Sequence, residues 1–184
     1  MNQPTLILLY GFAASGKTTL AKRYLEDHPL SLVVEGDVLI AMLGRWREHA
    51  REAGQLKLAL EESLVTTHLR SGYDVLLPIL PHDAALAERY EAIAHEAKAA
   101  FVEVLLDLDR EEAITRLLKR GNWGETGLPP LTESDRPRIE KKYDQMMAAM
   151  NQRENIVRIY PKEGEITETY ATLIATINRS IKRA

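Results

Sequence analysis

The sequence predicts an α/β fold, in which helices cover both faces of a parallel β-sheet. The first observation behind this prediction is that short apolar runs alternate along the chain with longer segments of helical periodicity. Such alternation is typical of parallel strands that are joined by right-handed helical crossovers. The second observation is that polar residues gather directly after the apolar runs. Ligands bind at the carboxyl ends of the strands in folds of this class.

Length and composition indicate a single globular domain over residues 1–184. The chain is 45% hydrophobic and 28% charged, as is usual for globular proteins. Its net charge of −3 disfavours a general nucleic-acid coat protein. The absence of cysteine excludes disulfides and thiolate metal sites. Residues 1–4 carry no lysine or arginine, and the apolar run after them has only the length of a strand. We therefore expect no signal peptide, no membrane span and a cytoplasmic location.

The first apolar run, Leu6 to Tyr10, leads into a glycine-rich loop and then into a helical segment, Thr19 to Asp27. The loop from Gly11 to Thr18, GFAASGKT, fits the pattern GxxxxGK[ST] of a phosphate-binding loop. Glycines at both ends let the chain curl, so that successive amide N–H groups and the positive end of the helix point at one polyphosphate. The alternative is a strand-to-helix turn that binds nothing.

The motif also predicts what its individual residues do. Lys17 is expected to reach the outer phosphates and to take part in catalysis, and the hydroxyl of Thr18 is expected to ligate Mg²⁺. The predicted nucleotide-binding residues are Gly11, Ala13, Ala14, Ser15, Gly16, Lys17, Thr18 and Thr19.

The next apolar run, residues 30–34, predicts a second buried strand that ends at two carboxylates, Glu35 and Asp37. Residues 38–50 have a helical pattern that is rich in large polar groups. A further helix follows them. Its apolar face is marked by Leu56, Leu60 and Leu64 at four-residue spacing and by Leu69 near its end.

Two more strands are predicted at residues 74–80 and 101–106, and a helical segment follows each of them. Pro78, within the first of these strands, indicates either the strand's end or an unpaired N–H. After the second strand, Asp107 and Asp109 are expected to be turn and capping residues.

Residues 121–130 contain three glycines and two prolines, a composition typical of a mobile loop. Thr132 and Asp135 are able to cap the helix that resumes after this loop. We therefore expect a mobile lid over about residues 121–136. The last strand and the closing helix are predicted at residues 155–160 and 166–181.

Taken together, these motifs resemble a known family. The GFAASGKTT loop, the carboxylates after the second strand and the arginine-containing lid are similar to features of the small P-loop kinases, which include shikimate, gluconate and nucleoside monophosphate kinases. The segment from Glu35 to Met42 is locally similar to chloramphenicol phosphotransferase. Arg116 and Arg120, with the tripeptide Gly121-Asn122-Trp123, resemble the start of the gluconate kinase lid.

This resemblance implies a three-layer P-loop NTPase fold with a five-stranded parallel sheet of order 2-3-1-4-5 and a mobile lid. It also implies ATP and Mg²⁺ as cofactors, adenine contacts near residues 162–166, and transfer of the γ-phosphoryl group to a small-molecule hydroxyl acceptor. One departure is Pro78, which stands on the third strand where many relatives place an acid. Because of it, Glu35 is the expected metal partner of Thr18.

Phosphoryl transfer to a hydroxyl group needs a nearby carboxylate that orients the acceptor and takes its proton. Asp37 is the candidate for this catalytic role, and a helix N-cap is the alternative. Glu35 lies two residues earlier and is expected on the same face of a strand, where it would help to hold the water shell of Mg²⁺. The alternative for Glu35 is a solvated acid at the end of the strand.

Arg116 and Arg120 are the candidate catalytic arginines. They lie four residues apart and therefore share one face of a helix. A closing lid would bring one of them over the phosphates, where it would stabilise charge in the transition state. The alternative is that both are solvated helix charges. One of Arg136 and Arg138 is expected to pair with a neighbouring acid.

Contacts to the acceptor are expected from the helix after Asp37, from the turn after the third strand and from the lid. The candidate substrate-binding residues are Asp37, Arg45, Trp46, His82 and Trp123. For His82 the alternative is a turn residue, and for Trp46 it is a place in the core. Trp123 stands in a polar glycine-rich loop, from which it could cover a bound ligand.

Two other kinds of function fit parts of the sequence. A polynucleotide 5′-hydroxyl or nucleotide kinase would use a basic groove of Arg45, Arg47 and Arg51, although the net charge disfavours a nucleic-acid partner. A non-catalytic ATP-binding regulatory module would keep the phosphate loop without transfer. A GTPase switch is disfavoured because the chain has no NKxD motif. The sequence makes no prediction of oligomeric state.

Overall fold

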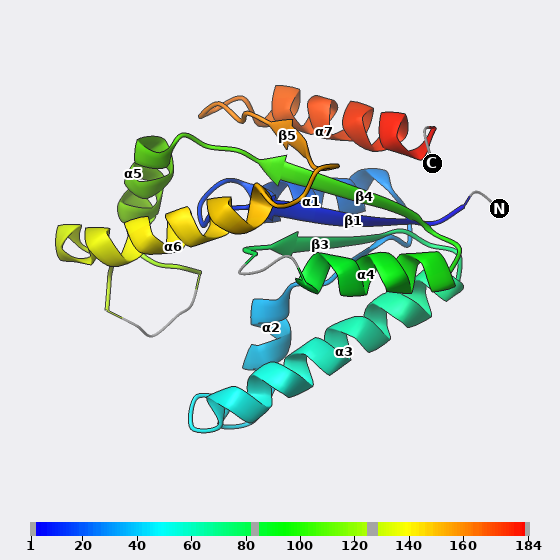
Figure 1. The fold of residues 1–184 in the computed structure, drawn as a ribbon, viewed down its shortest axis with the longest axis horizontal. Helices are drawn as coiled ribbons and strands as arrows, with labels where there is room; N and C mark the ends of the chain where they lie inside the picture. Colours follow the sequence, from blue (N-terminus) through cyan, green and yellow to red (C-terminus); the bar gives the residue numbers. More distant parts are fainter. Residues whose placement is uncertain (1–2, 82–84, 125–128, 183–184) are drawn as a thin grey trace.

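The computed structural model describes residues 3–81, 85–124 and 129–182, and it shows a five-stranded parallel sheet (Figure 1). The strand order β2-β3-β1-β4-β5 is the order that the family resemblance implies. The strands are β1 (Thr5–Gly11), β2 (Leu32–Val33), β3 (Val75–Ile79), β4 (Ala100–Leu106) and β5 (Val157–Ile159). The helices are α1 (Lys17–Asp27), α2 (Gly36–Ala41), α3 (Ala50–Arg70), α4 (Ala85–Glu96), α5 (Arg110–Arg120), α6 (Arg136–Met150) and α7 (Ile166–Ile181), with a 3₁₀ turn at Glu133–Asp135.

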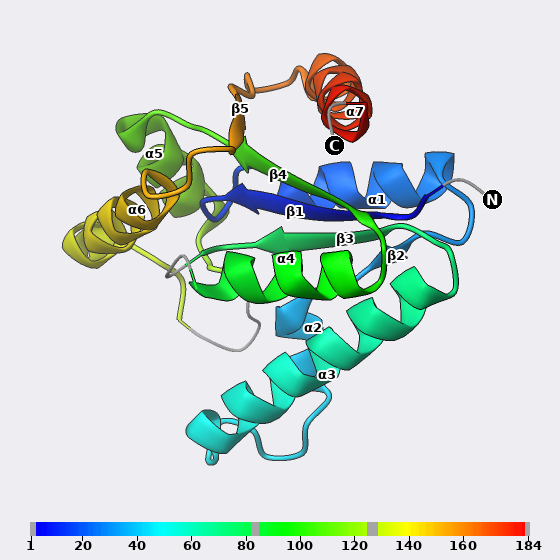
Figure 2. The same ribbon diagram turned by 45° about the vertical axis from the view of Figure 1, so that its right-hand side comes forward.

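Strand β1 lies in the middle of the sheet and is buried along its whole length. Leu6 and Leu8 belong to a core cluster that includes side chains of α3, α4, α5 and α6, whereas Ile7 and Leu9 belong to a cluster with α1 and α7. Successive side chains of a strand point to opposite faces, so β1 has a core on each side. Figure 2 shows the same layers, with α1 and α7 on one face of the sheet and α3 and α4 on the other.

Pro78 is accommodated inside β3, opposite Leu9 of β1. Strand β2 pairs only with Val75 and Leu76. It therefore ends before Pro78, and no strand on that side needs the N–H group that proline lacks.

The region between β2 and α3 differs from the sequence prediction. A single helical segment is expected over residues 38–50, but α2 ends at Ala41 and α3 begins at Ala50. Between them the chain makes turns, and Arg45 adopts a positive φ of 52°, which is incompatible with a right-handed helix.

The prediction of the apolar face of α3 is correct for Leu69 and wrong for the three leucines before it. Its buried residues are Ala53, Glu61, Val65 and Leu69. Leu56, Leu60 and Leu64 are exposed by 56%, 42% and 39%. The helix therefore packs a face that contains a charged side chain against the protein and leaves a row of leucines outside.

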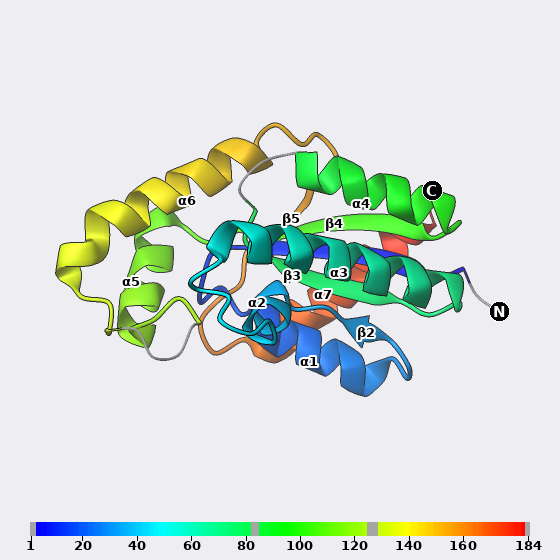
Figure 3. The same ribbon diagram turned by 90° about the horizontal axis from the view of Figure 1, so that it is seen from below.

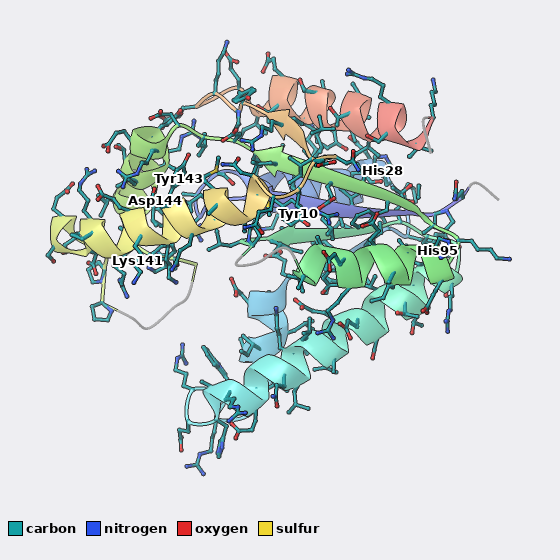
Figure 4. The ribbon with its side chains drawn as sticks, in the orientation of Figure 1. Tyr10, His28, His95, Lys141, Tyr143 and Asp144 are labelled. Atoms are coloured by element: carbon teal, nitrogen blue, oxygen red, sulfur yellow. The ribbon has the colours of Figure 1, made fainter. Side chains whose placement is uncertain are left out.

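A buried ion pair joins the end of α6 to the sheet. Arg153 donates to both carboxylate oxygens of Glu103 on β4, at 3.2 Å and 2.6 Å, and the hydroxyl of Tyr10 on β1 donates to the same carboxylate at 3.0 Å. Burial, followed by the charge of Glu103, raises the pKa of Tyr10, which is labelled in Figure 4. Because each member has a partner, this network satisfies its own polar atoms.

The capping predictions are confirmed. The carboxylate of Asp109 accepts from the amides of Glu111 and Glu112 at the start of α5, and Thr132 and Asp135 form a capping box before α6. Asp107 pairs with Arg158 of β5 at 2.7 Å. Of the predicted lid, the structure describes residues 121–124 and 129–136. Within the described residues, no helix is both long and apolar enough to cross a membrane.

Candidate active site

The loop between β1 and α1 curls so that several of its amides are left without a protein partner. Ala14 and Gly16 have positive φ angles of 62° and 98°, and the amide of Ser15 donates to the carbonyl of Phe12 at 3.2 Å. Within the described residues, the amides of Ala13, Ala14 and Gly16 donate to no acceptor. Unpaired N–H groups in such a curl, at the start of a helix, form a binding site for an anion.

The curl is held in place by close packing beneath it. A Cβ added to Gly11 would lie 2.5 Å from the hydroxyl oxygen of Ser15 and 3.2 Å from the carbonyl of Leu106. The hydroxyl oxygen of Ser15 is itself buried without a hydrogen-bond partner in the described part of the chain. Phe12 is buried and packs edge-to-face on Tyr143 of α6, at 5.4 Å between ring centroids. The loop is therefore anchored from below by apolar contacts, whereas its polar groups lack partners.

The side chain of Lys17 folds back over the loop. Its ammonium group donates to the carbonyls of Gly11 and Phe12 at 2.6 Å and 2.8 Å. Burial, followed by the positive charge of Arg120, lowers the pKa of Lys17 from 10.5 to about 7, and the negative charge of Asp37 opposes this shift. Arg120 and Asp37 thus both act electrostatically on Lys17. A bound polyphosphate would relieve the repulsion between the two cations.

The two candidate arginines of α5 have different surroundings. Arg120 is the last residue of α5, and its guanidinium forms no ion pair within the described residues. Arg116 pairs with Glu112 at 2.5 Å and approaches the carbonyl of Pro161 at 3.5 Å. Arg120 is therefore available to a ligand at the loop, whereas Arg116 connects α5 to the segment before α7.

A pocket with a volume of about 350 Å³ continues from the loop, between α1, α5 and the segment that leads into α7. Such a volume is within the usual range of small-ligand pockets, about 300–1,000 Å³. Residues 162–164 and Ile166 line it, where the family resemblance implies adenine contacts. The sequence analysis missed Lys119, Pro161 and Thr169 in this pocket because nothing in their local pattern marks them. The full lining is Ala14, Ser15, Gly16, Thr19, Leu20, Arg116, Lys119, Arg120, Pro161, Lys162, Glu163, Gly164, Ile166 and Thr169.

The two carboxylates after β2 do not share a strand face, contrary to the prediction. Strand β2 ends at Val33, Glu35 is the N-cap residue of α2 and Asp37 is in its first turn. The side chain of Glu35 makes no capping hydrogen bond. Asp37 is exposed, and it is not the N-cap that the alternative interpretation expects. Its carboxylate is close enough to Lys17 to affect the pKa of that lysine.

Helix α2 rests on a polar cluster that the sequence analysis missed. A Cβ added to Gly36 would overlap the side chains of Lys57 and Glu61 of α3. Glu61 is 5% exposed, pairs with Lys57 at 3.0 Å and accepts from the hydroxyl of Tyr90 at 3.3 Å. Burial raises the pKa of Glu61, and the ammonium group of Lys57 opposes this. The i,i+4 spacing of lysine and glutamate also fits an exposed helix face, so the sequence gives no sign of this contact.

The remaining predicted substrate residues are not gathered at this site. Arg45 is exposed and pairs with Glu48, in the turn between α2 and α3 that lies at the far end of α3 in Figure 1. Trp46 is half-buried and packs against Arg47, whose guanidinium carbon lies 4.6 Å from the ring centroid. Trp123 is also half-buried, with its ring 5.7 Å from that of Phe12. His82 lies outside the described residues.

The arginines of α6 are paired with acids, as predicted. Arg136 contacts Glu133 at 3.0 Å and Glu111 at 3.1 Å, and Arg138 contacts Asp135 at 3.0 Å. These contacts lie on the protein surface, where such pairs contribute little to stability.

Thr18 and Glu35 suit a metal site in which a bound phosphate supplies further oxygen ligands. Within the described residues, no cluster of three or more His, Asp or Glu side chains could hold a metal by itself. The hydroxyl of Thr18 is exposed beside the loop, and the carboxylate of Glu35 has no hydrogen-bond partner in the part of the chain that the structure describes. Mg²⁺ often uses one or two protein oxygens together with phosphate oxygens and waters, and the two residues fit that pattern.

The parallel sheet, the curled loop after its central strand and the lysine at the start of α1 define a P-loop nucleotide-binding protein. The profile of a family described as AAA domain matches residues 6–150. The chain belongs to this family, and its relatives place it among the small P-loop kinases.

Two of these relatives are annotated adenylate kinases. The adenylate kinase of Phocaeicola vulgatus is 33% identical over 130 residues, which cover 62% of this chain and 67% of the relative. The adenylate kinase of Synechococcus sp. strain WH7803 is 33% identical over 128 residues, with 62% and 68% coverage.

Solved structures are similar in fold over nearly the whole chain. A protein of Chloroflexus aurantiacus described as a candidate kinase has a TM-score of 0.69 at 16% identity, and the match covers 96% of this chain and 98% of that one. A chain of the Pnkp1/Rnl/Hen1 RNA repair complex has a TM-score of 0.66 at 19% identity, with 89% of this chain and 51% of that chain covered. At these identities the likeness concerns the fold alone.

Proposed function

We propose that this protein is a kinase that transfers the γ-phosphoryl group of ATP to a hydroxyl group of a small molecule. ATP-dependent phosphoryl transfer is supported by the family to which the chain belongs. The observation that carries the hydroxyl acceptor is that Arg120, which lines the pocket beside the loop, and Asp37, in the first turn of α2, both act electrostatically on Lys17. Two cations and one carboxylate are the charges that transfer to an alcohol requires.

On the nucleotide side, the loop holds the phosphates and Arg120 acts on the transferring group. The unpaired amides of Ala13, Ala14 and Gly16 would bind phosphate oxygens. Lys17 would exchange its two carbonyl partners for the outer phosphates. Arg120 would stabilise the charge that spreads over the γ-phosphoryl oxygens in the transition state. Mg²⁺, when it is held by Thr18 and Glu35, supplies further neutralisation of phosphate charge.

On the acceptor side, Asp37 orients the hydroxyl group and takes its proton. The acceptor oxygen forms a bond to the γ-phosphorus as the bond between that phosphorus and the β–γ bridging oxygen breaks, which leaves ADP. The proton passes from the hydroxyl group to the carboxylate of Asp37 and then to water. The exposed position of Asp37 in the first turn of α2 leaves its oxygens accessible to an acceptor.

The adenine and ribose of ATP fit the pocket between α1, α5 and the segment before α7. The pocket is continuous with the loop through Ser15 and Gly16 and with the phosphate side through Arg120. Arg116 joins two of its walls by contacting both Glu112 and the carbonyl of Pro161. We assign Arg116 to the shape of this pocket rather than to the phosphates.

Transfer to a nucleoside monophosphate is a second candidate function, and the adenylate kinase relatives favour it. A phosphate acceptor needs cations around its own phosphate group. Helix α2 has the sequence GDVLIA, in which the single charged residue is the acid Asp37. Lys57, on the adjacent helix, is paired with Glu61. Of the arginines that a nucleotide kinase would use, Arg45 is paired with Glu48, whereas Arg51 is exposed at the start of α3. The charges of α2 itself suit an uncharged hydroxyl better than a second phosphate.

The deciding experiment measures ADP release from ATP and Mg²⁺ with a panel of hydroxyl-bearing metabolites, and with AMP, CMP, GMP and UMP. For the acceptor that responds, Asp37→Asn is expected to lower turnover by about a hundredfold or more, with ATP affinity within about twofold. Glu26→Gln is the matched control, because Glu26 is exposed near the far end of α1 and its substitution changes the net charge equally.

Each class of result has a distinct meaning. ADP release with a hydroxyl compound that depends on Asp37 supports the proposal. Release only with a nucleoside monophosphate, at a rate that Asp37→Asn leaves unchanged, replaces it with the second candidate. ATP binding without release for any compound of either panel would favour a non-catalytic ATP-binding module.

A further inference from the structure

The outer face of α3 is apolar and is not covered by the rest of the protein. Leu56, Leu60 and Leu64 are exposed by 56%, 42% and 39%, although their spacing in the sequence is typical of a buried stripe. The view from below in Figure 3 shows α3 in front of the sheet, with no described element lying over its outer side. A row of exposed leucines on a long helix is a feature of interaction surfaces.

This face carries no charge along most of its length. Exposed charged residues of α3 stand only at its two ends, with Arg51 and Glu52 at the start and Arg70 at the end. Arg51 is turned by about 100° from Glu52 around the helix, so Glu52 and Arg70 are the end charges of this face. Between them, the exposed residues of α3 are Gln55, Leu56, Ala59, Leu60, Ser63, Leu64 and Thr67. The charged residues of this stretch, Lys57, Glu61 and Glu62, belong to the side that packs on the protein.

The two end charges are opposite, lie on the same side of the helix and are unpaired. Glu52 and Arg70 are 18 residues apart, which is five full turns of an α-helix at 3.6 residues per turn. Neither side chain forms an ion pair within the described residues. A partner for this face should therefore be apolar in the middle, basic opposite Glu52 and acidic opposite Arg70.

We propose that the partner is a second copy of this chain, bound through α3 in an antiparallel, two-fold symmetric pair. The face is self-complementary about its centre near residues 60 and 61. With the symmetry axis level with residue 60, Leu60 meets Leu60 of the partner subunit and Leu56 faces Leu64 of the partner subunit. Arg70 of the partner subunit then lies two residues, about 3 Å along the helix, from the level of Glu52, which is within reach of its long side chain. Each residue of one helix then has a suitable neighbour on the other, as a two-fold interface requires.

Packing and electrostatics both favour the antiparallel arrangement. Ala59 and Ser63 are small residues near the centre of α3, where they permit a close approach of the two helices. Antiparallel helices place the negative end of one dipole beside the positive end of the other. A parallel pair would instead place Glu52 beside Glu52 of the partner subunit, and like charges would repel.

The pair of helices forms a small interface, so the dimer is expected to be reversible. A single seam of about five turns is at the lower end of specific interface sizes. We expect a dissociation constant on the order of 10 µM, with monomers at about 1 µM and mostly dimers at about 100 µM. This inference is independent of the proposed function, because it uses none of the residues of the active site.

The first test is sedimentation equilibrium of the full chain over that concentration range, without nucleotide. Leu60→Glu is expected to raise the dissociation constant at least tenfold, because it places two carboxylates against each other at the symmetry axis. The matched control is Leu25→Glu on α1, since Leu25 is 40% exposed and Leu60 is 42% exposed. Leu25→Glu should leave the dimer unchanged, and circular dichroism should show both variants folded.

The second test exchanges the end charges and is specific to the antiparallel register. Glu52→Arg alone and Arg70→Glu alone should each weaken the dimer several-fold, and the double variant should restore it. A structural defect of either single variant would not be repaired by the other. A chain that stays monomeric at about 100 µM, a dimer that Leu60→Glu does not weaken, or a double variant without rescue would each overturn the proposal.

Discussion

The phosphate loop and the α2–α3 region differ in how their polar and apolar groups are satisfied. Around the loop, apolar side chains are buried, whereas the amides of Ala13 and Ala14, the hydroxyl of Ser15 and the guanidinium of Arg120 lack partners in the described part of the chain. In the α2–α3 region, the buried polar side chains beneath α2 are paired with one another, through Lys57, Glu61 and Tyr90, and it is leucines that stand exposed.

The two regions therefore favour binding in different ways: the loop offers polar groups that lack partners, whereas the α2–α3 region offers a fixed support. A buried polar group without a partner, such as the hydroxyl of Ser15, costs free energy, and we expect a ligand at the loop to supply partners to its polar groups. The polar cluster beneath α2 already satisfies itself, and in the proposed function it holds α2, and with it Asp37, at a fixed place. On this proposal, the first region defines the class of reaction, whereas the second sets the position of the acceptor.

The largest expected effect comes from a methyl group added beneath the loop. In Gly11→Ala, the new Cβ would meet the Ser15 hydroxyl at 2.5 Å and Leu106 at 3.2 Å. Leu106 belongs to a buried strand, so the loop must move instead. Overpacking of this kind costs about 1–3 kcal/mol. We expect ATP affinity to fall at least tenfold, as measured by isothermal titration calorimetry.

Gly44→Ala, in the turn between α2 and α3, is the control for Gly11→Ala. A Cβ added to Gly44 would have no atom within 4 Å, so Gly44→Ala should bind ATP like the natural sequence. Equal affinities for the two alanine variants would mean that the packing beneath the loop is irrelevant to nucleotide binding.

A smaller effect is expected where α2 meets α3. In Gly36→Ala, the new Cβ would overlap Lys57 and Glu61, whose flexible ends can move only by shifting the buried cluster or α2. Asp37 is the next residue, so turnover should fall about tenfold while ATP affinity stays unchanged, because the phosphate loop is not touched. Steady-state rates of ADP release, together with calorimetric ATP affinities, would measure both quantities.

Gly54→Ala on α3 distinguishes strain from helix propensity. Gly54 also has no atom within 4 Å of an added Cβ, and alanine in a helix is favoured over glycine by about 1 kcal/mol. This variant should be more stable than the natural sequence and just as active. A loss of turnover that is equal in the Gly36 and Gly54 variants would argue against positioning of Asp37 by this contact.

The same two regions also differ in how far the sequence predicts them. The curl of the loop is predicted because its motif is local: the conformation from Gly11 to Thr18 depends on immediate neighbours in the chain, above all on the two glycines. The sheet order and helix α5, whose predicted limits the structure matches, follow from strong periodicity and from the family resemblance.

The α2–α3 region is mispredicted because its packing depends on distant partners. The leucine row of α3 has the pattern of a buried face, but the face that packs inward carries Lys57 and Glu61, which are stabilised by each other, by Tyr90 of α4 and by the close approach of Gly36. No local pattern identifies a buried ion pair of this kind. The positive φ of Arg45 interrupts the helix that is predicted over residues 38–50, and no local sequence pattern predicts it.

The smallest expected effect is that of pH on ATP affinity, which acts on the phosphate loop through Lys17. In the free protein the pKa of this lysine is lowered to about 7, first by burial and then by Arg120. A bound polyphosphate stabilises the ammonium form and raises its pKa. Above about pH 7, ATP binding must therefore take up a proton, and the affinity should fall as the pH rises.

Titration calorimetry of ATP with EDTA present, between pH 7.5 and 8.5, would measure this linkage without a contribution from Mg²⁺. The free phosphates do not titrate in this range, since their last pKa is about 6. We expect ATP affinity to fall several-fold over the interval in the natural sequence, and proton uptake to appear as a dependence of the binding heat on the buffer. In Lys17→Met the affinity should be weaker but independent of pH. A natural sequence whose affinity is flat over this interval would show that Lys17 stays protonated in the empty loop, held by the carbonyls of Gly11 and Phe12.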